Sequence, residues 1–193
     1  MSYLAPAEFV TKMVDAGESK IFMSTRDTLI RAFMAGAILA LAAVFAVSIN
    51  VQTGNPLIGA LLFPVGFCML YLLGFDLLTG VFVLAPLALI DKRPGVTVRG
   101  VLCNWMVSAG VVGAMISTHV SGKVIAMWMP IMLFFYMVFE HSIVNMFLFP
   151  SGLLLGAHFT ILDYLIWNEI PTVLGNLVGG LAFTGLTLYA THI

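Results

Sequence analysis

Two apolar runs of 34 residues constrain this chain more than any other feature. They extend from Leu57 to Ile90 and from Val124 to Ala157, and their only ionisable side chains are Asp76 in the first and Glu140 and His141 in the second. A membrane-spanning helix needs about 20 apolar residues, because the hydrocarbon layer is about 30 Å thick. A straight helix of 34 residues would be about 51 Å long. Each run is therefore expected to break inside the membrane.

The composition indicates a membrane protein of one domain, residues 1–193. Hydrophobic residues make up 61% of the chain and charged residues only 9%, whereas soluble domains carry about 25% charged residues. The net charge of −1 argues against a nucleic-acid partner. Cys68 and Cys103 lie inside apolar runs and are expected to be free thiols. No His or Cys spacing suits a metal site, so neither a metal nor another cofactor is expected.

The hydropathy pattern predicts five spans. Besides the two long runs, the apolar segments are 32–50, 101–118 and 170–189. Residues 6–24 carry apolar side chains at helical spacing, which predicts an amphipathic helix in the segment 1–30 that precedes the first span.

The two long runs share a pattern that indicates an internal repeat. "FDLLTGVFVLAP" (75–86) and "FEHSIVNMFLFP" (139–150) each contain Phe, an acid, and Pro ten residues after the acid. Backbone leaves helical geometry at membrane depth only where it is buried in protein or lines a cavity, and paired interrupted helices are typical of transport folds. The sequence predicts an all-α helical bundle with two broken helices in an inverted repeat. The alternative is two ordinary helices, each kinked by Gly and Pro.

Four stretches carry a family resemblance: "LLGFDLLTG" (72–80), "GVLCNWMVSA" (100–109), "FEHSIVNMFLFP" (139–150) and "IPTVLGNLVGG" (170–180). With them the chain resembles the formate/nitrite transporter family of bacterial anion channels. The resemblance implies an aquaporin-like fold and a homo-pentamer in the bacterial inner membrane with one pore per subunit. It also implies passage of formate, nitrite, hydrosulfide or similar small weak-acid anions. Phe75 departs from the family, which usually has a small residue there, and so does Leu78, where Phe or Ile is usual.

By motif position, the resemblance implies that Thr79 and His141 face each other in the pore and that Asn104 also lines it. The implied apolar constrictions are Phe63 and Phe134 on one side and Phe67, Leu77 and Leu78 on the other.

His141 suits a proton donor because imidazole titrates near neutral pH. An anion that gains a proton crosses an apolar constriction at a much lower desolvation cost. The alternative for His141 is a structural histidine that bonds between helices. Glu140 would point about 100° away from His141 on a helix. Glu140 and its repeat partner Asp76 are therefore expected to be structural carboxyl groups bonded to backbone N–H groups.

The family has six spans, so one span is missing here, and residues 91–99 are its predicted place. Lys and Arg mark cytoplasmic ends of spans. They gather in the N-terminal segment and in the loop 91–99, while the predicted loop 156–169 has none. Five alternating spans would put that last loop inside, against the charge bias, and a sixth span near residue 99 removes the conflict. The N-terminus is expected to be cytoplasmic.

Three functions compete. The first is a channel or transporter for small monovalent weak-acid anions that His141 protonates during passage. The second is a truncated, non-conducting subunit of such a channel. The third is an intramembrane enzyme using Glu140 and His141, but the sequence lacks a nucleophile motif for it. The expected answer is therefore a transporter and not an enzyme.

Overall fold

The computed structural model describes residues 3–75 and 94–192, which fold into helices joined by short turns. The predicted pore residue Thr79 lies outside the described residues, as do Leu77 and Leu78 of the predicted constrictions and the carboxyl residue Asp76.

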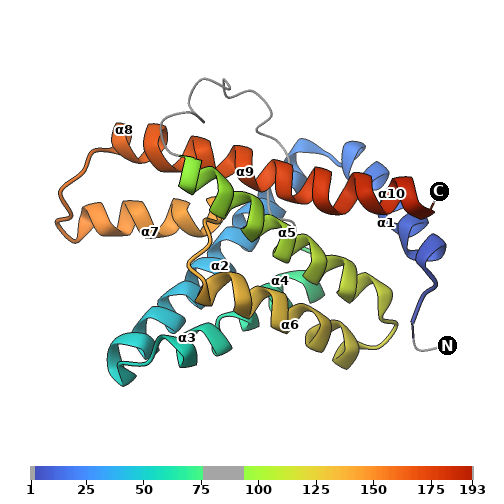
Figure 1. Cartoon of the computed structure of the whole chain (residues 1–193), viewed down its shortest axis with the longest axis horizontal. Helices are drawn as coiled ribbons and strands as arrows, with labels where there is room; N and C mark the ends of the chain where they lie inside the picture. Colours follow the sequence, from blue (N-terminus) through green and yellow to red (C-terminus); the bar gives the residue numbers. More distant parts are fainter. Residues whose placement is uncertain (1–2, 76–93, 193) are drawn as a thin grey trace.

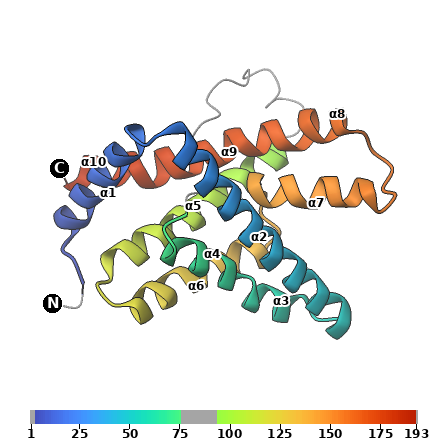
Figure 2. The same ribbon diagram turned by 180° about the vertical axis from the view of Figure 1, so that it is seen from behind.

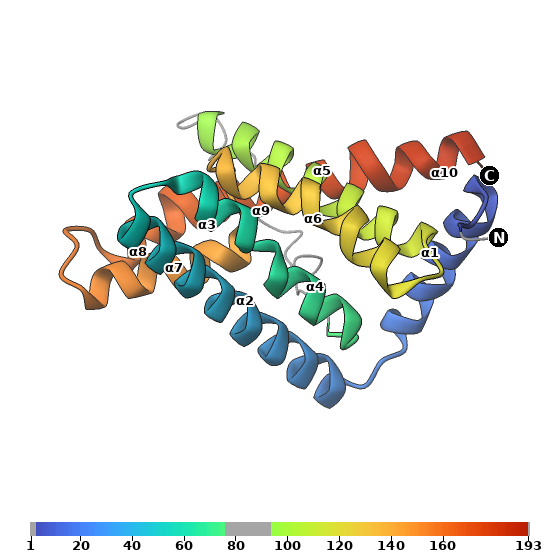
Figure 3. The ribbon, with the colours of Figure 1, turned by 90° about the horizontal axis from the view of Figure 1, so that it is seen from below.

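The first half is a helical hairpin preceded by a separate helix. Its helices are α1 (Pro6–Ile21), α2 (Thr25–Thr53), α3 (Pro56–Leu62) and α4 (Pro64–Leu72). Ser24 caps α2 by accepting from the Asp27 N–H, and Gly54 ends it with a φ of +66°. Figure 3 shows α3 and α4 returning alongside α2. The predicted span 32–50 is confirmed as part of the longer α2.

The second half consists of α5 (Pro94–Ile116), α6 (Val120–Tyr136), α7 (Ser142–Leu154) and a long terminal rod. The rod comprises α8 (Ile161–Tyr164), the π-helical η2 (Leu165–Glu169), α9 (Ile170–Gly180), the π-helical η3 (Leu181–Leu186) and α10 (Thr187–His192). In Figure 1 these pieces form one nearly straight helix, with α5 beside it. Figure 2 shows α7 between α2 and α9, both of which it contacts.

Two loop predictions are wrong in part. Residues 94–99 were expected in a loop but form the first turns of α5, which Pro94 begins because the first helical position needs no N–H. Most of the loop expected at 156–169 is helical from Ile161. Thr160 and Asp163 form a reciprocal capping box that starts the helix there.

The α5–α9 contact fixes the frame of the second half. A Cβ atom at Gly179 would overlap the Val101 carbonyl oxygen, and one at Gly175 would overlap the Thr97 carbonyl oxygen. Only glycine allows the two backbones to approach this closely, as in membrane helix pairs generally. The contact brings the amides of Asn104 on α5 and Asn176 on α9 within hydrogen-bonding distance of the backbone of the other helix.

The predicted N-terminal helix is present as α1, and its apolar side packs on protein. Phe9 and Val10 are buried against Val112 of α5 and Leu188 of α10. Both termini lie at this end of the molecule (Figure 1).

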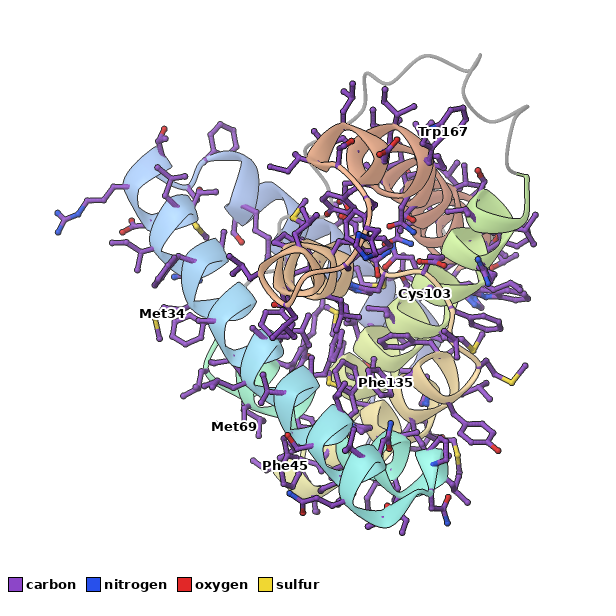
Figure 4. All side chains as sticks on the ribbon, turned by 90° about the vertical axis from the view of Figure 1, so that its left-hand side faces the viewer. Met34, Phe45, Met69, Cys103, Phe135 and Trp167 are labelled. Carbon is purple, nitrogen blue, oxygen red and sulfur yellow. The ribbon has the colours of Figure 1, made fainter. Side chains whose placement is uncertain are left out.

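The surface is suited to lipid. Within residues 3–75 and 94–192, three helical segments are long and apolar enough to cross a membrane: Thr25–Thr53, Gly95–Ile116 and Ile161–His192. In Figure 4, Met34 of α2 and Met69 of α4 point outward, while Cys103 of α5 points into the interior. The outer side of α2 exposes large apolar groups such as Phe33 and Leu41. Such a continuous apolar surface belongs in a membrane.

Candidate functional site

The end of α4 in the first half and the end of α6 at the second break share one backbone design. Three successive N–H groups turn back onto the last turn of α4 in the first break and of α6 in the second. This is the Schellman pattern of helix ends. At the end of α4, the N–H groups of Leu73, Gly74 and Phe75 donate to the carbonyl oxygens of Met69, Tyr71 and Leu70. At the end of α6, those of Met137, Val138 and Phe139 donate in the same order to Leu133, Phe135 and Phe134. Phe75 and Phe139, which begin the two similar stretches of sequence, occupy the same position in these two patterns. The backbone therefore supports the internal repeat.

Val138 adopts a left-handed conformation. Its φ is +54°, where Gly74 at the matching position has +72°. A β-branched residue in this region is strained by roughly 1–2 kcal/mol. The second break is therefore held in place by the packing around it.

We expect Val138→Gly to raise the stability of the protein by up to about 1 kcal/mol, because strain relief exceeds the added freedom of glycine in the unfolded chain. Thermal unfolding in detergent measures this. Val138→Ala keeps a Cβ atom at the same φ and should give no comparable gain. A lower unfolding temperature for the glycine variant would contradict the strain.

His141 lies at the end of the second break and caps α7. Its Nδ1 accepts from the Val144 N–H at 3.4 Å. Its ring stacks on Phe134 at 5.5 Å and meets Phe67 edge-on at 5.7 Å, measured between ring centroids. The side chain is 1% exposed. Its Nε2 has no hydrogen-bond partner among the residues the structure describes.

Three of the predicted constriction residues form one cluster beside His141. Phe63, Phe67 and Phe134 are buried, and their ring centroids are 5.7–5.9 Å apart. Phe63 and Phe134 were expected on the opposite side of the pore from Phe67. The structure brings all three into mutual contact, as one apolar cluster.

Glu140 has side-chain partners where backbone N–H partners were expected. Its Oε2 accepts from the amides of Asn145 at 2.9 Å and Asn168 at 3.1 Å, and its Oε1 lies 3.1 Å from the Arg99 guanidinium. The difference arises because α7 begins at Ser142, which leaves Glu140 outside the helix and turned toward α5 and η2.

Asn176 of α9 connects the second break to α5 and α9. The sequence did not point to this residue. Its Oδ1 accepts from the Ser142 N–H, and its Nδ2 donates to the carbonyl oxygens of Gly100 and Glu140. Its own carbonyl oxygen accepts from the Asn104 amide at 2.6 Å. The available signal was a lone Asn within a Gly-rich apolar helix.

Glu169 is a second buried carboxyl group that the sequence analysis missed. One oxygen accepts from the Ser142 hydroxyl and the other from the Tyr164 hydroxyl. Glu169 was expected in an exposed loop, but it lies inside the terminal rod and is buried.

Two open cavities flank this region. One, of about 430 Å³, is lined by Phe67, Tyr71 and Asn104, together with Lys20 of α1. The other, of about 550 Å³, is lined by residues that include Arg99, Glu140, His158, Asp163 and Asn168. His141 packs on Phe67, which lines the first cavity, and the adjacent residue Glu140 lines the second. No group of three His, Cys, Asp or Glu side chains suited to a metal occurs in residues 3–75 and 94–192.

The formate/nitrite transporter family matches the chain twice, over residues 7–97 and 94–190. The two matches meet where the sequence analysis places the missing span. Formate-nitrite transporter 2 of Toxoplasma gondii is 29% identical over 96% of this chain and 55% of its own length, so the chain spans about half of that relative. Formate channel BtFdhC of Bacillus thuringiensis is 24% identical over 100% of this chain and 97% of its own.

The alignment with BtFdhC runs over 257 positions, against 193 residues here, so the chain is shorter than this relative. A pentameric formate channel with formate bound superimposes with a TM-score of 0.71 at 19% identity, covering 86% of this chain and 96% of the channel chain. This likeness shows the fold. Because the family matches extend from residue 7 to residue 190, the chain belongs to the formate/nitrite transporter family, which consists of transporters and channels and not of enzymes.

Proposed function

We propose that this multi-pass membrane protein conducts small monovalent weak-acid anions, such as formate or nitrite, and that His141 protonates the anion during passage. The observation that carries the proposal is the position of His141. It is a buried imidazole that packs on Phe67 of the first cavity and directly follows Glu140 of the second, and no described residue bonds its Nε2.

The barrier beside His141 explains why a proton is needed. Phe63, Phe67 and Phe134 offer no polar atom to an anion. Burying an unpaired carboxylate is far more costly than burying a neutral acid. A proton donated at the barrier therefore lowers the cost of crossing, and the proton returns to the imidazole or to water on the far side.

We infer a homo-pentamer in the bacterial inner membrane, with small anions and lipid as its partners and no cofactor. The related channel of the same fold is pentameric and holds formate. Asn104 would line the pore from the side of the first cavity.

Anion flux into liposomes tests the proposal. Proteoliposomes are expected to take up ¹³C-formate or nitrite faster than protein-free liposomes, with saturation at high anion concentration. Lack of protein-dependent uptake by a correctly assembled oligomer would favour the alternative of a non-conducting subunit, which the shorter chain makes a specific competitor.

We expect Thr79→Val to lower flux about tenfold while assembly is unchanged. The Thr79 hydroxyl is the proposed partner of His141 Nε2, and a lost hydrogen bond to a buried polar group costs about 1–3 kcal/mol. Thr79→Ser keeps the hydroxyl and should conduct like the parent. Flux from both variants, with oligomer size measured by gel filtration, checks this. Equal flux from Thr79→Val and the parent would remove the hydroxyl from the mechanism.

We expect both termini in the cytoplasm, because both lie at the same end of the molecule (Figure 1) and the N-terminal segment is basic. A C-terminal green fluorescent protein fusion should fluoresce, and a C-terminal alkaline phosphatase fusion should be inactive. The opposite pair of results would mean that the missing span inverts the second half of the chain.

A further inference from the structure

We propose that Arg99 makes the second cavity a binding site for small monovalent oxyanions and carboxylates, where the anion competes with Glu140 for the guanidinium group. The direction of travel from this site to His141 depends on the proposed function, but the binding itself does not.

The charges around the cavity favour this role. Among the described residues that line it, Arg99 is the only arginine or lysine. The other ionisable groups there are Glu140, Asp163, His158 and Tyr164. Asp163 is engaged by Thr160 in the capping box, and Tyr164 donates to Glu169. An entering anion therefore meets one strong cation.

Glu140 is anchored and Arg99 is accessible. One oxygen of Glu140 is held by Asn145 and Asn168, and its side chain is 14% exposed. The Arg99 side chain is 48% exposed and meets Glu140 through one nitrogen, Nη2. A guanidinium group has five N–H donors arranged to bind two oxygens of one anion side by side. Formate and nitrite each present two such oxygens.

Arg31 in the first half of the repeat provides a control for Arg99 in the second half. Arg31 in "RAFMAG" (31–36) corresponds to Arg99 in "RGVLCN" (99–104), since each lies within the first two turns of the long helix of its half, α2 or α5. Arg31 donates through Nη1 to the Gly74 carbonyl oxygen at the first break, at 3.1 Å. Arg99 pairs with Glu140 at the second. Arg31 bonds the backbone directly, whereas Glu140 keeps Asn145 and Asn168 as partners without Arg99. Arg31 lines neither of the two cavities.

The concentration dependence of formate flux separates capture from a purely structural role. We expect Arg99→Gln to raise the KM for formate about tenfold, equivalent to about 1.4 kcal/mol, with a maximal rate within about twofold of the parent. Glu140→Gln should lower KM, because it frees the guanidinium group. Arg31→Gln should leave KM unchanged and lower only the maximal rate. If Arg99→Gln behaves like Arg31→Gln, Arg99 only holds the break and the proposal is overturned.

A binding measurement that does not require transport tests the Arg99 site separately from the proposed conduction of anions. Line broadening of ¹³C-formate by the purified parent oligomer should be lost in Arg99→Gln even if the parent does not conduct. It should also weaken as ionic strength rises from about 0.01 M to about 1 M, because the screening length falls from about 30 Å to about 3 Å. Equal broadening by parent and variant overturns the site.

Should Arg99→Gln not assemble, Arg99→Lys replaces it, since lysine keeps the charge but not the paired donors. It should raise KM about threefold, and an unchanged KM would overturn the proposal.

Discussion

Replacement of His141 by asparagine is expected to lower formate flux about a hundredfold near pH 6 and to flatten the dependence of flux on pH. A positioned proton donor commonly contributes a factor of about 10²–10⁴ to a reaction rate. Asparagine retains an oxygen that can accept from the Val144 N–H and cap α7, as Nδ1 of His141 does. It has no titratable group to offer at the barrier of Phe67 and Phe134. The loss should therefore come from proton donation and not from collapse of the break.

The sign of the pH effect follows from the donor. Flux through the parent should rise as pH falls, because only a protonated donor can give a proton to the anion. The variant should show only the increase that protein-free liposomes show from diffusion of the neutral acid. Stopped-flow measurement between pH 5 and 8 gives both curves, in steps of about half a unit.

His119 provides the matched control. It is exposed, it precedes α6 and it lines neither of the two cavities. His119→Asn removes an imidazole but leaves both His141 and the proposed anion site untouched, so its curve should follow the parent. If the curves for His141→Asn and the parent coincide, His141 is not the proton donor.

The architecture was largely predictable because it depends on local patterns. Apolar run length located α2 and α5, and the shared spacing of Phe, acid and Pro located the end of α4 and the break between α6 and α7. The exact ends were less predictable. The break was expected over 139–145, but α7 resumes at Ser142 because the His141 side chain caps it. Capping depends on side-chain geometry that hydropathy does not contain.

The site was predictable where the chain itself carries the signal. An acid and a histidine inside an apolar run identified Glu140 and His141. The partners of these residues come from distant segments. Glu169 is 27 residues from Ser142 in the sequence, and Asn176 is 76 residues from Gly100. The packing of α9 on α5 and of η2 on α7 brings them together, so no local pattern could reveal their roles.

Asn176 therefore gives the second large effect, because it joins three segments through one side chain. In Asn176→Leu, the Ser142 N–H loses its acceptor and the carbonyl oxygens of Gly100 and Glu140 lose their donor. Hydrogen bonds between membrane helices contribute about 0.6 kcal/mol on average and up to about 1.7 kcal/mol. The loss of three should destabilise the protein by about 2–5 kcal/mol, a large share of a typical total of about 5–15 kcal/mol.

We expect a much lower thermal unfolding temperature in detergent for Asn176→Leu and little assembled oligomer. Val178→Leu, on the exposed side of the same helix, adds apolar bulk without removing a hydrogen bond and should behave like the parent. Asn176→Asp keeps an acceptor for the Ser142 N–H but loses both donated bonds and adds a carboxyl group beside the Glu140 carbonyl oxygen. It should therefore not rescue stability. A parent-like unfolding temperature for Asn176→Leu would mean that the second break is held in place without α9, since Asn176 is the residue through which α9 bonds to both Glu140 and Ser142.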